Sequence, residues 1–148
     1  MKVRNEHFAM TPAAAKVNLR VIGTALVLIH FIASIAHGKA HAGASVMLSS
    51  FGYAYVLVVI TVAPLIAAAL LYSRWLKWGA WLLTLSMLGS FVFGVWHHFL
   101  EASNDNVAAV LGPWHAMFLW TAVVLAIIEF AGIAIGWWMV GATRERIA

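Results

Sequence analysis

Apolar side chains dominate this chain of 148 residues, of which 64% are hydrophobic and 9% are charged. A soluble globule of this size needs more polar surface, so the composition excludes a soluble domain and indicates a membrane protein. The net charge of +4 reflects where the cations lie around the apolar segments, and we expect no nucleic-acid partner. Because the chain has no cysteine, thiolate metal sites, disulfides and thiol redox chemistry are excluded.

Four apolar stretches are each near or above the length that crosses about 30 Å of hydrocarbon as a helix. They predict an all-α fold, a polytopic membrane protein that forms one four-transmembrane-helix antiparallel bundle over residues 1–148. The expected spans are about 18–42, 46–72, 77–101 and 114–142. Residues 1–17 are expected to form a cytoplasmic N-terminal segment.

The placement of lysine and arginine predicts the orientation, because these side chains resist translocation across a membrane. Eight of the nine cations flank segments that share one side of the predicted bundle, and only Lys39 falls in the opposite loops. We therefore expect both the N and C termini to be cytoplasmic and the chain to be a multi-pass protein of the inner (cytoplasmic) membrane. The other ends of the spans then face the periplasmic or extracellular side.

The first span carries three histidines in a single column. At 100° per residue, His30, His37 and His41 fall within an arc of about 40°, from the middle of the membrane to its outer surface. The Ala-His-Ala sequence around His41 resembles a signal-peptidase site. We expect no cleavage there, because the apolar run is long and the polar segment before it extends to Arg20.

The second and third spans each contain one informative feature. Pro64 lacks an N–H, so it is expected to kink the second span about two-thirds of the way across. In the third span His97 and Glu101 are one turn apart on a shared face, whereas His98 points about 100° away. At most one of the two adjacent histidines is therefore expected to face a site.

The fourth span begins near His115, after a loop in which Ser, Asn and Asp predict turns. Gly132 and Gly136 form a small-xxx-small pair, which indicates a close helix contact within the bundle. Mid-span Glu129 lies at a depth similar to that of His30, and an ionisable group in hydrocarbon normally turns inward toward a partner. The two residues are candidates for a proton relay, or for a buried hydrogen bond that fixes helix register.

Five of the seven histidines fall at the ends of spans on the outer side of the predicted membrane. Imidazole is the commonest protein ligand for transition metals. With the nearby carboxylate they predict a metal site for copper, iron or zinc that serves redox chemistry, electron transfer or metal handling. The candidate ligands are His37, His41, His97, His98, Glu101 and His115.

Other uses of the same residues stay open. A b-type haem needs one or two axial imidazoles and an apolar slot, which a membrane bundle can provide. The chain can also be a cofactor-free accessory subunit of a larger membrane complex, or a small proton-coupled transporter that uses His30 and Glu129. The expected partners are the lipid bilayer and either other membrane subunits or further copies of the chain. The sequence does not decide whether the protein is an enzyme.

Overall fold

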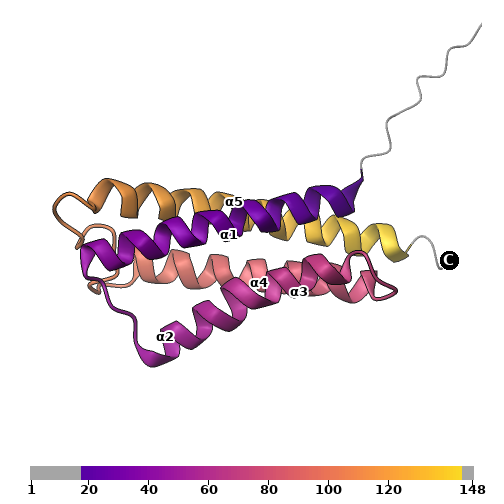
Figure 1. The fold of residues 1–148 in the computed structure, drawn as a ribbon, viewed down its shortest axis with the longest axis horizontal. Helices are drawn as coiled ribbons and strands as arrows, with labels where there is room; N and C mark the ends of the chain where they lie inside the picture. Colours follow the sequence, from indigo (N-terminus) through magenta and orange to yellow (C-terminus); the bar gives the residue numbers. More distant parts are fainter. Residues whose placement is uncertain (1–17, 145–148) are drawn as a thin grey trace, which may run out of the picture.

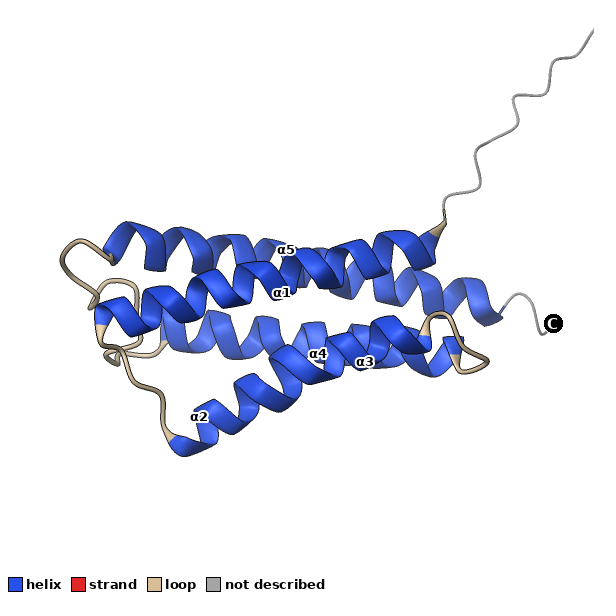
Figure 2. Ribbon diagram, viewed as in Figure 1, coloured by secondary structure: helices blue, strands red, loops and turns tan. Residues whose placement is uncertain are grey.

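Four antiparallel helical rods form the protein in the computed structural model, which describes residues 18–144 (Figure 1). These residues contain no strand (Figure 2). The rods are, in chain order, α1 (Leu19–Ala44), then α2 (Ser50–Tyr55) with the π-helical segment η1 (Val56–Val62) and α3 (Ala63–Leu70), then α4 (Leu76–Val95) with the π-helical segment η2 (Trp96–Leu100), and α5 (His115–Arg144). The expected cytoplasmic segment 1–17 lies outside the described residues.

Each rod is long and apolar enough to cross a membrane. The candidate spans contain 21 to 29 residues, against the roughly 20 that cross the hydrocarbon. Their outward faces carry large apolar side chains such as Ile32, Ile127 and Phe130, each about two-thirds exposed. The prediction of an all-α chain with four such helices is confirmed.

The break between the first two rods is wider than the sequence suggested, because two serines end one helix and begin the next. Ser45 has a left-handed backbone (φ 58°) that terminates α1. The Ser49 hydroxyl then accepts a hydrogen bond from the Gly52 N–H at 3.1 Å and caps α2. Residues 46–49, which the apolar pattern assigned to the second span, are therefore a linker.

The second rod changes its hydrogen-bond register just before Pro64. The π-helical turns of η1 end at Val62, and Pro64 lies at the start of α3, where a missing N–H costs least. The Thr61 hydroxyl donates to the Val56 carbonyl, five residues earlier, at 2.9 Å. In Figure 1 the α2 end of this rod diverges from the rest of the bundle.

The tightest contact in the bundle is between α4 and α5. A Cβ added at Gly136 would lie 3.0 Å from the backbone N of Thr84, and one added at Gly132 would lie 2.7 Å from Cγ of Met87. Only glycine therefore allows this approach of the two helices. The expected intra-bundle contact of the two glycines is present.

Apolar clusters lie at both ends of the bundle. The larger one joins α1, α3, α4 and α5 near the end where α1 begins and α5 finishes, and includes Val27, Leu83 and Met139. The smaller one contains Ala40, Val46, Val110 and Phe118 at the opposite end. Buried polar side chains, among them His30 and His37 of α1, occupy the interior between and beside these clusters.

Candidate metal centre

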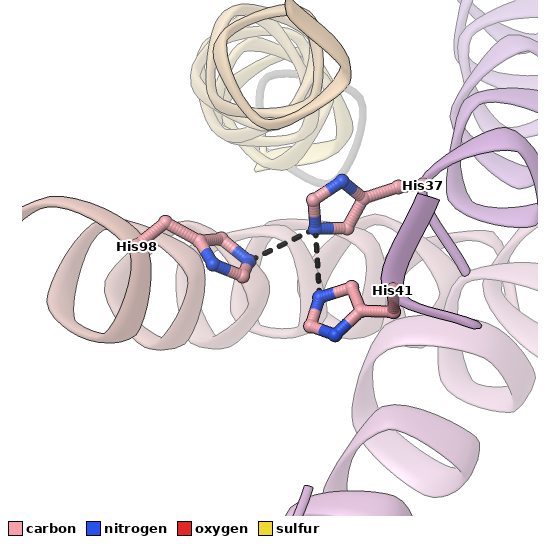
Figure 3. Close-up of side chains that lie close together, drawn as sticks. All are labelled: His37, His41 and His98. Carbon is pink, nitrogen blue, oxygen red and sulfur yellow. Dashed lines mark hydrogen bonds between the residues drawn. The ribbon is translucent and has the colours of Figure 1, made fainter. Parts of the chain in front are cut away.

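Three histidine side chains converge at the end of the bundle that bears the α1–α2 linker (Figure 3). His37 and His41 come from successive turns of α1, and His98 comes from the π-helical segment η2. The Nε2 atom of His37 lies 3.0 Å from Nε2 of His98 and 3.2 Å from Nε2 of His41. In Figure 3 all three rings turn these nitrogens toward one point.

The other ring nitrogen of each histidine faces a hydrogen-bond acceptor. These contacts join Nδ1 of His37 to the Thr121 Oγ1 at 2.8 Å, Nδ1 of His98 to the Asp105 carbonyl at 3.0 Å, and Nδ1 of His41 to the Val46 carbonyl at 3.4 Å. A carbonyl oxygen can only accept, and the Thr121 hydroxyl donates its own proton to the Met117 carbonyl at 2.6 Å. Each Nδ1 therefore carries the proton, a tautomer assigned from these partners.

That tautomer leaves an unshared electron pair on every Nε2 in the group. Two unprotonated nitrogens about 3 Å apart repel each other unless a proton or a cation lies between them. Nitrogens bonded to one tetrahedral ion at about 2.0–2.1 Å lie roughly 3.3 Å apart, close to the 3.0 and 3.2 Å that separate Nε2 of His37 from those of His98 and His41. Metal-binding histidines also typically donate their second N–H to a carbonyl or carboxylate, as His98 and His41 do, while His37 donates to the Thr121 hydroxyl.

Phe118 closes one side of the histidine group. Its ring is fully buried and its centroid lies 4.7 to 5.3 Å from the centroids of all three imidazoles. The ring excludes water from that side and fixes how the imidazoles pack. An ion at this position would therefore be held by a preorganised set of rings.

Asp105 supplies a buried carboxylate next to two of the histidines, behind the ring of His98 and beside the metal-facing nitrogen of His41. Its Oδ1 lies 3.3 Å from Nδ1 of His98 and 3.5 Å from Nε2 of His41, and neither carboxylate oxygen has a partner with good hydrogen-bond geometry. Burial, the largest influence, raises the pKa of Asp105, but the nearby His98, His41 and His97 rings together lower it below its ordinary value of 3.8. Asp105 thus favours its anionic form and balances positive charge at the site.

His30 and Glu129 form a separate buried pair toward the middle of the bundle. The Nε2 of His30 lies within hydrogen-bond distance of Oε1 of Glu129, at 3.2 Å, and the two residues are 1% and 4% exposed. The contact expected from their similar depth is present. It joins α1 to α5, and His30 lies about two turns of α1 away from His37.

The remaining candidate ligands have other contacts. His97 Nδ1 lies 2.6 Å from Oε2 of Glu101, in a pair that is about one-third exposed. His115 Nδ1 donates to the Val110 carbonyl at 2.7 Å. Among the described residues these three do not belong to the group whose ligand atoms converge. Of the two adjacent histidines, His98 is the one that turns inward.

Sequence reasoning missed three residues of this site. Asp105 was part of a loop interpreted as turns, and Thr121 and Phe118 were ordinary residues of an apolar helix. Asp105 carried one usable signal, since an acid in the loop between the third and fourth spans lies near the ends of the helices that bear the histidines. No comparable signal marked Thr121 or Phe118.

A cavity of about 460 Å³ adjoins the histidine group. It extends between α1, the diverging α2 end of the second rod, α4 and α5. His37, His41 and His98 line it at one end and Glu129 lines it deeper in the bundle, among mostly apolar side chains. The cavity therefore connects the histidine group with the His30–Glu129 pair.

The fold and the site together define an all-helical chain with four helices that can cross a membrane and a buried three-histidine group able to hold a metal ion. No family model, curated protein or solved structure matches the chain.

Proposed function

We propose that the protein is a small integral membrane metalloprotein that binds one transition-metal ion through Nε2 of His37, His41 and His98. The observation that carries the proposal is the convergence of three Nε2 atoms whose rings all donate Nδ1–H elsewhere. The ion satisfies the three electron pairs at once, which a single proton cannot do.

The donor set suits copper, iron or zinc. Imidazole binds all three ions, and the chain has no thiolate that would select among them. Three protein ligands leave a coordination position free, as in catalytic zinc sites, and the adjoining cavity gives access to it. Redox chemistry, electron transfer or metal handling is the work we assign to such a centre.

A haem is less well supported by the geometry. Two axial imidazoles of a haem lie on opposite faces of the macrocycle, with their nitrogens roughly 4 Å apart, twice a metal–nitrogen bond of about 2 Å. Nε2 of His37 and Nε2 of His98 are 3.0 Å apart, too close for a porphyrin between them. The proposal therefore favours a directly bound ion.

The proposed orientation places this centre on the periplasmic or extracellular side of an inner membrane. Arg74 in the α3–α4 turn and Lys77 in the first turn of α4 lie at the bundle end where α1 begins and α5 finishes, whereas the histidine group lies at the other end (Figure 1). Because cations favour the cytoplasmic side, both termini are then cytoplasmic. Fusion of a reporter active only in the periplasm to either terminus should give no signal.

Metal analysis of paired variants tests the centre. His98→Gln removes one converging nitrogen, and His97→Gln changes the neighbouring imidazole, which pairs with Glu101. In detergent-purified protein we expect about one ion per chain in the wild type and in His97→Gln, and background metal in His98→Gln. Equal metal content in the two variants would overturn the assignment, and a Soret band in the visible spectrum would overturn the haem-free site.

We also propose that His30 and Glu129 relay protons between the middle of the membrane and the metal centre. Support comes from their buried 3.2 Å contact and from the cavity that Glu129 shares with the three histidines. Glu129→Gln keeps the shape of the side chain but removes the transferable proton. Proton uptake should fall in this variant, and unchanged uptake would remove the relay. Proton coupling in metal-free protein would instead favour the transporter alternative, and an accessory subunit would show neither property.

A further inference from the structure

The cavity beside the histidine group has an apolar wall on the side of the diverging second rod. Val56 and Ile60 of η1 line that wall, and Phe93 and Leu125 line the opposite side from α4 and α5. A volume of about 460 Å³ lies within the range of pockets that hold small ligands, roughly 300–1,000 Å³. The cavity is thus large enough for a molecule with a ring and a short chain.

The edge of this cavity reaches the outer surface of the bundle. Met47 in the α1–α2 linker and Tyr53 in α2 both line the cavity, and they are 75% and 49% exposed. The linker and α2 form the end of the second rod that diverges from the other helices in Figure 1. We therefore expect a ligand to enter the cavity between the linker and α2.

The hydroxyl and N–H groups around the cavity already donate hydrogen bonds to other atoms of the protein. Three hydroxyl groups donate within the protein: Ser34 to the His30 carbonyl at 2.8 Å, Ser90 to the Ser86 carbonyl at 2.9 Å, and Tyr53 to the Met47 sulfur at 3.7 Å. The Nδ1–H groups of the three histidines are also used, as described above. What remains is acceptor capacity: the Asp105 carboxylate oxygens, which have no hydrogen-bond partner, and, when no ion is bound, the Nε2 electron pairs of the three histidines.

We propose that this cavity binds a lipid-soluble molecule whose single polar group is a hydroxyl, directed at the histidine end of the cavity. An acceptor-only polar wall recognises a donor, and the apolar remainder of the wall recognises a hydrocarbon body. A neutral hydroxyl fits better than an ammonium group, because a charge carried into this apolar space loses its hydration. The cavity and its acceptors belong to the chain itself, so the proposal goes beyond the metal centre and does not require the ion.

Two glycines allow the cavity to be blocked without a clash. A Cβ at Gly38 would have no atom within 4 Å, and a Cβ at Gly94 would make ordinary contacts with Glu129 and His98 at 3.9 and 4.0 Å. Both glycines line the cavity, so Gly38→Leu and Gly94→Leu direct a side chain into it. Gly141→Leu is the matched control, since a Cβ there also has open space but Gly141 does not line this cavity.

The probe is tritiated 4-pentylphenol, with 4-pentylanisole as the analogue that lacks the donor. Binding is measured by equilibrium dialysis against the full chain in lipid nanodiscs, with empty nanodiscs as the blank and circular dichroism as the check on folding. We expect saturable binding of the phenol and at least about tenfold weaker binding of the methyl ether, because a hydrogen bond to a buried acceptor is lost. Gly38→Leu and Gly94→Leu should weaken phenol binding at least about tenfold, with Gly141→Leu unchanged.

Each other outcome overturns a stated part of the proposal. Phenol binding no greater than in empty nanodiscs removes the binding site. Equal affinity for phenol and ether removes the recognition of a hydroxyl, and unchanged binding in folded Gly38→Leu places the probe elsewhere. Metal content measured in the same samples separates the two proposals. Bound metal without phenol binding would overturn only the hydroxyl-binding cavity, and phenol binding without bound metal would overturn only the metal centre.

Discussion

Replacing Thr121 with valine separates a metal centre from a simple cluster of packed histidines. Valine keeps the branched shape of threonine but removes the hydroxyl that accepts the Nδ1–H of His37 at 2.8 Å. His37 is 7% exposed, so this N–H loses its partner without gaining water. The ring then either keeps a buried unsatisfied donor or moves its proton to Nε2, where it blocks the ion.

The expected cost can be estimated from this contact. Losing the hydrogen-bond partner of a metal-binding histidine typically lowers metal affinity about 10- to 100-fold, which corresponds to about 1.4–2.8 kcal/mol. An unsatisfied buried donor costs a similar amount, about 1–3 kcal/mol. We therefore expect Thr121→Val to weaken binding of Cu⁺ or Zn²⁺ by one to two orders of magnitude while the bundle remains folded.

The assay is a competition titration of purified protein against a chromophoric chelator of known affinity. Thr143→Val is the matched control, because the Thr143 hydroxyl also donates to a carbonyl of α5, that of Val140 at 2.8 Å, but does not contact a histidine of the group. The control should keep wild-type affinity. Wild-type affinity in Thr121→Val would show that the His37 tautomer does not matter and would refute the reasoning that leads to the ion.

Three further predictions concern packing and pH. Gly136→Ala should lower the free energy of unfolding by about 1–3 kcal/mol in a denaturation experiment, because the new Cβ would lie 3.0 Å from the Thr84 backbone. Gly141→Ala, the control, should change the free energy of unfolding little, because a Cβ there has open space. Equal effects of the two substitutions would contradict the close packing of α4 and α5. Because the pKa of Asp105 lies below 3.8 in the folded chain, its carboxylate stabilises the fold above that pH, and this stabilisation is lost as the pH falls through the lowered pKa. The difference in unfolding free energy between the wild type and Asp105→Asn should therefore shrink in acid. A difference that stays constant with pH would contradict this role of Asp105. Metal affinity measured with the same chelator should fall as the pH is lowered, because imidazoles bind metal only when neutral, and a pH-independent affinity would exclude ligation by the three histidines.

The helices could be predicted from the sequence because their signal is local. Apolar length alone defines a span, and the column of His30, His37 and His41 follows from the 100° step of a helix. The contact of His30 with Glu129 could also be predicted, because two ionisable groups at the same depth in hydrocarbon are stabilised by pairing with each other. Each of these arguments uses only the periodicity of one helix or the depth of a residue in the membrane.

Membership of the histidine group could not be predicted in the same way. Whether His97 or His98 turns inward depends on the π-helical register of η2, and no residue in this segment predicts that register. The contribution of Asp105 depends on how the loop after η2 folds back, with the Val107 N–H donating to the His98 carbonyl at 2.9 Å. These are tertiary facts, and hydropathy carries no information about them.

The π-helical segment Trp96–Leu100 suggests how such a ligand set can arise. A π-turn holds one more residue than the α-turn it replaces, so it is what a single-codon insertion into an ordinary apolar helix produces. Deleting one residue from the segment would restore α register and swing the following side chains by about 100°. A descendant with that deletion would keep its bundle and lose its third imidazole, so in this architecture the capacity to hold an ion can be gained or lost independently of the fold.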